Sequence, residues 1–257
     1  MRYKSIENKL YINNRKKYLK HVEENSISIF VSNDPMPTNA DETLPFVQNT
    51  NLLYLTGIDQ EDTYLILAPN FPDERMREIL FIKETSEEIS IWEGNKLSKD
   101  EARKISGIQN VMWNDEFNKI IPLITAESNN AYLDKNEHIR SSTKVETAQD
   151  RFLKNFKSKN NSINIQRSYP ILSSLRMIKD KVEIDLISHA CKITEKGFRR
   201  VLKFIKPEVN EYDIEAELIH EFIINKSKGF AYQPIIATGI NACSLHYNCL
   251  LYTSPSP

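Results

Sequence analysis

The chain has 257 residues, 40% hydrophobic and 27% charged, which excludes a wholly disordered protein and fits one or two domains. Its 34 basic and 35 acidic residues leave a formal net charge of -1, which argues against recruitment of nucleic acid or an anionic membrane. The sequence shows no apolar run of the ~18 residues that a membrane span needs and no signal-like N-terminus. The three dispersed cysteines are typical of reduced thiols. These features predict a cytoplasmic protein.

The first half of the chain alternates between helical and extended patterns. Spaced apolar positions predict a helix over 6–22, and the polar stretch 97–105 is suited to a second helix. Short β-rich runs predict strands at 27–31, 52–55, 64–68, 79–82 and 89–92. Strands mixed with helices predict an α/β domain, built as a mixed sheet with flanking helices.

A polar stretch then separates two parts of the chain. Residues 155–168 are rich in Asn, Lys and Ser, and Tyr169-Pro170 follows them. Weakly patterned polar sequence is typical of a domain boundary. We therefore predict a first domain over 1–172 and a second over 173–257.

Two helices are predicted in the second part. The first has an apolar stripe at spacings of three and four and ends before Lys206-Pro207, because proline cannot continue a helix. The second begins after the capping residue Asn210, with Asp213 three positions further on. A β-rich run follows at 233–238. The pattern indicates the incomplete start of an α+β domain with a marginal core, whose exposed apolar helix faces would favour aggregation.

Two short patterns resemble parts of metal sites. Cys243, His246 and Cys249 have a spacing suited to zinc, but a fourth ligand is missing, so incidental cysteines are the favoured interpretation. His220-Glu221 starts a zincin motif, which requires a second histidine at position 224, where this chain has isoleucine. We interpret it as a solvated helix edge.

Two further patterns also have plain structural explanations. The segment from Gly239 lacks the further glycines and the Lys-Ser/Thr pair of nucleotide-binding loops, and it is interpreted as a turn. Glu215, Glu217 and Glu221 are predicted to be solvated charges, since the apolar stripe of their helix faces inward. Composition and spacing alone therefore identify no catalytic machinery.

Longer segments carry a family resemblance. They are 39–41 (NAD) with 44–57 (LPFVQNTNLLYLTG), 91–94 (IWEG), 175–180 (LRMIKD) with 183–184 (EI), and 232–247 (YQPIIATGINACSLHY). Together they resemble aminopeptidase P (Xaa-Pro aminopeptidase), a family of pita-bread metallopeptidases. The first and last segments are the most specific, because their matches are long and ordered.

The resemblance implies an α/β N-terminal domain that mediates homo-oligomer contacts, followed by an α+β pita-bread catalytic domain. In the family, two divalent ions, typically Mn²⁺, are held by two aspartates, one histidine and two glutamates. A bridging hydroxide attacks the peptide bond before proline. The implied substrate is a peptide with proline in the second position.

Three residues match family positions that contact the substrate. His246 matches a catalytic histidine that hydrogen-bonds the scissile group, and its imidazole can donate or accept near neutral pH. Tyr232 matches a tyrosine of the same pocket. Trp92, by default a core or edge aromatic, matches a tryptophan presented by the N-terminal domain of a neighbouring subunit.

The chain departs from the family pattern at its end. All five family ligands lie downstream of the His246-Tyr247 pair, and the chain stops ten residues after Tyr247. Residues 250–257 resemble a foreign or frame-shifted tail. We therefore expect a fragment that binds no metal and is inactive, from a full-length enzyme that uses two divalent ions, expected to be Mn²⁺.

Two alternatives stay open. The protein could be a prolidase-like or creatinase-like hydrolase, because one fold serves several substrates. It could also be a non-catalytic binding or oligomerisation module, made of the N-terminal domain and a vestigial partner.

Overall fold

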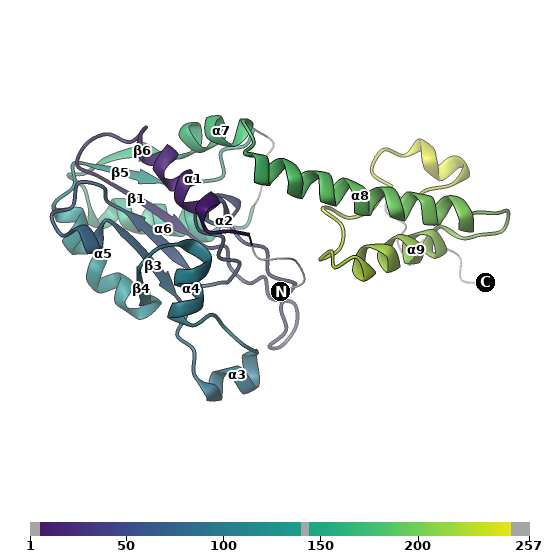
Figure 1. The fold of residues 1–257 in the computed structure, drawn as a ribbon, viewed down its shortest axis with the longest axis horizontal. Helices are drawn as coiled ribbons and strands as arrows, with labels where there is room; N and C mark the ends of the chain where they lie inside the picture. The colour runs from purple at the N-terminus through teal and green to yellow at the C-terminus, as the bar shows by residue number, and fades with distance from the viewer. Residues whose placement is uncertain (1–5, 140–143, 248–257) are drawn as a thin grey trace. The chain divides into compact units, whose positions relative to one another are not determined.

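The computed structural model describes residues 6–139 and 144–247 (Figure 1). The chain divides into two units, Ile6–Ile178 and a second that begins at Lys179. The predicted boundary after residue 172 lies inside helix α7, Tyr169–Met177. This helix stays with the first unit because its Leu172 is buried in that unit's core.

A six-stranded mixed sheet lies at the centre of the first unit, in the order β4-β3-β2-β1-β5-β6. Strand β2 runs antiparallel to both β1 and β3, and the other neighbours are parallel. The strands are β1 Ser26–Val31, β2 Tyr64–Leu67, β3 Glu78–Ile82, β4 Asn110–Trp113, β5 Asn130–Leu133 and β6 Asn164–Arg167. The predicted mixed sheet is thus confirmed.

Helices cover both faces of this sheet, and alternate strand residues enter two separate cores. Phe30 faces a core with residues of α1 (Lys9–Leu19), α2 (Thr50–Thr56), α4 (Lys99–Ser106) and α7. Ile29 faces the other core, with residues of α5 (Phe117–Ala126) and α6 (Ala148–Lys159). Burial on both faces explains why β1 is buried along its whole length.

Two of the predicted strands are helices, and that part of the sequence interpretation is wrong. Residues 52–55 lie in α2, which Asn49 caps by accepting hydrogen bonds from the amides of residues 51 and 52, and which ends at Gly57 with φ of 72°. Residues 89–92 lie in α3, Glu87–Glu93, capped by Ser86. In both runs the capping side chains decide against the β propensity of the apolar residues.

The second unit contains the two predicted helices, α8 Lys181–Phe204 and α9 Glu211–Ile224. Helix α8 ends before the Lys206-Pro207 pair, as predicted. The helices approach closely at Gly197, where an added Cβ would lie 3.0 Å from Leu218 and 3.1 Å from Phe222. Many apolar side chains of the pair are exposed, as expected; among them are Ile184, Ile187, Phe198, Leu202, Ile223 and Ile224.

The strand predicted at 233–238 does not form. The described residues of the second unit contain no strand, and this run is irregular chain before a 3-10 turn, Gly239–Cys243. A β-rich run needs a neighbouring strand to pair its backbone groups. Among the helices of the described ranges, none is long and apolar enough to cross a membrane.

Candidate functional site

The three residues predicted for the site are all exposed, and they belong to two different units of the chain. Trp92 belongs to the first unit, on α3, and its side chain is 87% exposed; α3 lies away from the sheet in Figure 1. Tyr232 and His246 belong to the second unit, and both are exposed, Tyr232 to 78%. No hydrogen bond joins Tyr232 to His246 in the part of the chain that the structure describes.

The chain next to His246 is held by a buried carboxylate that sequence reasoning missed. Glu211, the first residue of α9, is 9% exposed. Its Oε1 accepts hydrogen bonds from the Thr238 amide at 2.6 Å and from Asn241 Nδ2 at 3.3 Å, and its Oε2 accepts one from the Tyr247 hydroxyl at 2.9 Å. Asn241 Nδ2 also donates to the Tyr247 hydroxyl at 3.0 Å. In sequence, Glu211 looks like an ordinary acidic residue of a first helical turn.

The acidic residues of α9 are not all solvated, which corrects the sequence interpretation. Arg200 of α8 forms an ion pair with Glu217 and lies 3.8 Å from Glu221. Asn225 also donates to the Glu221 carboxylate at 2.8 Å. These charges therefore hold α8 and α9 together, because the arginine reaches across from the neighbouring helix.

The described residues do not fit a two-metal centre. Within 6–139 and 144–247, no group of three or more His, Cys, Asp or Glu side chains could hold an ion. Cys243 is a free, exposed thiol, while Cys249, the third member of the Cys-His-Cys pattern, lies outside the described residues, as does the tail 250–257.

The segment around residues 48–57, which belongs to one of the two most specific matches to the family, forms a buried polar network at the carboxyl ends of β1 and β5. Asn49 Nδ2 donates to the Val31 carbonyl at 3.1 Å and to Asp134 Oδ2 at 2.8 Å, and Asn51 Nδ2 donates to Asp134 Oδ1 at 2.8 Å. Burial raises the pKa of the Asp134 carboxyl, against these hydrogen bonds and the charge of Arg176, which lower it. The segment thus has a structural role in joining α2 to the sheet.

Arg176 joins two of the segments that resemble the family. Its NH1 donates to Asn51 Oδ1 at 2.6 Å and to Thr50 Oγ1 at 3.1 Å, and its guanidinium lies 5.8 Å from the centre of the Tyr54 ring. The last turn of α7 is therefore fixed on α2, just before the end of the first unit. Polar residues at positions 50, 51 and 176 thus link the two segments in this chain.

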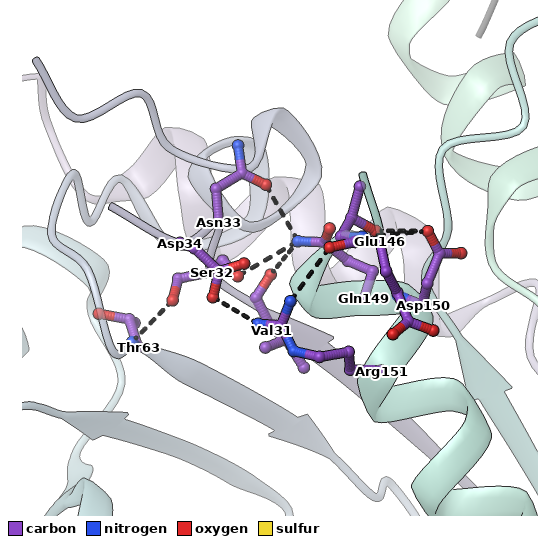
Figure 2. A network of polar contacts seen from close by, with 10 residues as sticks. Val31, Ser32, Asn33, Asp34, Thr63, Glu146, Gln149, Asp150 and Arg151 are labelled. Carbon is purple, nitrogen blue, oxygen red and sulfur yellow. Dashed lines mark hydrogen bonds and ion pairs between the residues drawn. The ribbon is translucent and has the colours of Figure 1, made fainter. Parts of the chain in front are cut away.

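A second polar network lies at the carboxyl end of β1 (Figure 2). Gln149 Nε2 donates to the Val31 carbonyl at 3.0 Å, to the Ser32 carbonyl at 3.2 Å and to Asn33 Oδ1 at 3.0 Å. Arg151 NH2 forms an ion pair with Asp34 at 2.7 Å. Helix α6 is thereby joined to β1, and these polar groups satisfy one another, as in a structural network.

Both parts of the chain match known proteins. Residues 11–132 match the family model "Aminopeptidase P, N-terminal domain", and residues 185–253 match "Metallopeptidase family M24". The Xaa-Pro aminopeptidase of Haemophilus influenzae is 28% identical over 233 residues, covering 91% of this chain and 51% of that protein. Human Xaa-Pro aminopeptidase 3 is 26% identical over 222 residues, covering 85% and 43%. The chain spans about half the length of the curated relatives it matches.

Solved structures show the same relationship. A Bacillus anthracis structure described as an aminopeptidase P is 30% identical, with a TM-score of 0.84 over 94% of this chain and 57% of that chain. A Zn-substituted Escherichia coli aminopeptidase P in complex with product is 22% identical, with a TM-score of 0.81 over 95% and 56%. The fold is therefore that of the N-terminal domain of these proteins with the beginning of the next domain.

Proposed function

Because this chain belongs to the aminopeptidase P family, we propose that the whole protein is an Xaa-Pro aminopeptidase, which removes the N-terminal residue from peptides with proline in the second position. One observation carries the proposal. The two family models match in succession, an aminopeptidase P N-terminal domain followed by an M24 metallopeptidase domain. The first of these matches favours aminopeptidase P over prolidase-like and creatinase-like hydrolases.

The cofactor of the whole protein is proposed to be two divalent ions, with Mn²⁺ as the physiological metal. The Zn-substituted relative supports a divalent ion. Since the described residues of this chain supply no ligand cluster, the 257-residue chain alone is proposed to bind no such pair of ions and to be inactive.

The substrate contacts of this half are proposed to come from three side chains. The exposed imidazole of His246 is suited to donate a hydrogen bond to the scissile group, and the exposed ring of Tyr232 is suited to line the same pocket. Trp92 and Ile91 are large apolar side chains that are almost fully exposed on α3, which supports a homo-oligomer contact through the first unit. Trp92 would then reach the site of a neighbouring subunit.

The remaining partners and the compartment are also proposals. A net charge of -1 supports a protein without nucleic-acid or membrane partners. Cys191 and Cys243 are free thiols, which supports a reducing, cytoplasmic compartment.

The proposed activity is tested with the complete product of the gene. With Mn²⁺ present, Xaa-Pro-Xaa tripeptides should be cleaved before proline at least about tenfold faster than Xaa-Pro dipeptides, because the catalytic preference is a difference in transition-state binding. Chromatographic measurement of the released amino acid checks this. Faster cleavage of dipeptides would indicate a prolidase, hydrolysis of creatine alone would indicate a creatinase, and no hydrolysis would indicate a binding module.

A further inference from the structure

The irregular chain 238–247 has little apolar packing to hold it in place. Ile240 and Leu245 are 83% and 89% exposed, and the only regular element here is the short turn Gly239–Cys243. Exposed loops of this kind owe their position to specific polar bonds. The position of His246 therefore depends on the groups that fix the chain on either side of it.

Glu211 fixes this chain at three points. One carboxylate oxygen accepts hydrogen bonds from the Thr238 amide, where the segment begins, and from Asn241 within the turn; the other accepts the hydroxyl of Tyr247, the residue after His246. An ionised carboxylate is an acceptor at both oxygens, so it can serve all three donors at once. Such charge-assisted bonds are stronger than neutral ones.

The donors also reinforce one another. Asn241 donates to the Tyr247 hydroxyl at 3.0 Å, and that hydroxyl donates onward to Glu211 at 2.9 Å. Bonds in such a chain polarise each other. Because Glu211 is 9% exposed and begins a regular helix, the whole set rests on a rigid support.

We propose that Glu211 is a positioning residue, which holds the chain around His246 so that the imidazole meets the scissile bond of a prolyl peptide. The proposal rests on the proposed function. Glu211 acts through Thr238, Asn241 and Tyr247 and leaves the imidazole itself exposed. A glutamine at position 211 keeps the shape but offers only one acceptor oxygen, so at least one of these donors loses its partner.

The structural half of the proposal is tested in the 257-residue chain. Glu211→Gln should speed hydrogen exchange of the Thr238 amide by about tenfold, measured by NMR. Glu215→Gln, which removes a charge one turn further along α9, should leave that exchange unchanged. Unchanged exchange in Glu211→Gln overturns the proposal, whatever the activity of the wild type.

The catalytic half is tested in the complete gene product with an Xaa-Pro-Xaa tripeptide. Glu211→Gln should lower kcat and raise KM, with kcat/KM falling about tenfold or more. Tyr247→Phe should lower kcat/KM by a smaller factor. Glu215→Gln should keep the wild-type kcat and KM. A merely structural role would lower kcat through the loss of folded enzyme and leave KM unchanged, which overturns the proposal. An inactive wild type overturns the proposed function instead, and the exchange result then decides the role of Glu211 alone.

Discussion

Replacing Arg15 with methionine is expected to lower the free energy of unfolding of the first unit by about 3–5 kcal/mol. The Arg15 side chain is 1% exposed. Its NH1 donates to the carbonyls of Leu55 at 2.8 Å and Ser106 at 3.0 Å, and its Nε donates to Glu78 at 3.0 Å. These carbonyls belong to the last turns of α2 and α4, so methionine would leave helix-end acceptors and a half-buried carboxylate without a partner.

Burial lowers the pKa of Arg15, while Glu78 opposes this by favouring the charged form. The measurement is denaturant unfolding followed by tryptophan fluorescence, because Trp92 and Trp113 are the only tryptophans of the chain and both lie in the first unit. Arg75→Met is the matched control, since Arg75 pairs with Asp73 on the surface, and it should lower the free energy of unfolding by only a small fraction of the loss in Arg15→Met. A loss below about 1 kcal/mol in Arg15→Met would contradict a structural role for this buried cation.

The stability advantage of the wild type over Asp134→Asn is expected to shrink as the pH rises. Burial raises the pKa of Asp134 above its ordinary value of 3.8. The folded protein therefore keeps this proton at a pH where the unfolded chain has lost it, so stability falls with increasing pH through that window. The contribution is complete below the ordinary value and is lost as the pH passes the raised pKa. Asparagine cannot ionise, so Asp134→Asn lacks this slope.

The wild type and Asp134→Asn are unfolded at several pH values between pH 3 and pH 7, again followed by fluorescence. The difference between their free energies of unfolding at each pH tests the prediction directly. Asp73→Asn provides a control of opposite sign. Hydrogen bonds from Arg75 lower the pKa of Asp73, so the advantage of the wild type over this variant should grow as the pH rises. A difference for Asp134→Asn that is constant over this range would show that burial does not perturb the carboxyl.

The parts of the fold that the sequence predicts correctly are those with strong local patterns. Strands β1, β2 and β3 are continuous β-rich runs, and α8 and α9 have apolar spacing, a proline stop and the Asn210–Asp213 cap, whose backbone bond forms at 3.0 Å. Strands β4, β5 and β6 lack such a run, since their sequences are NVMW, NAYL and NIQR, and they gain their stability from pairing with a distant strand.

The errors have identifiable causes. The apolar residues of the run 52–55 favour a strand, although Asn49 before it and Gly57 after it are the residues expected at helix ends. The run at 233–238 lacks a partner strand among the described residues, which no local pattern could indicate.

The site was predictable only in part. His246, Tyr232 and Trp92 came from the resemblance, and their roles stay predictions. Glu211 could not be found, because its partners at 238, 241 and 247 lie far along the chain and only the fold brings them to the start of α9. The same holds for Arg200, which neutralises glutamates that a helical wheel places towards solvent.

The most direct measurement is the release of the N-terminal residue from an Xaa-Pro-Xaa tripeptide by the purified 257-residue chain, with Mn²⁺ added. We expect no release above the rate in buffer, because the described residues offer no cluster of side chains to hold an ion and activate water. Metal-dependent release that a chelator abolishes would contradict this expectation and place a working metal centre within these 257 residues.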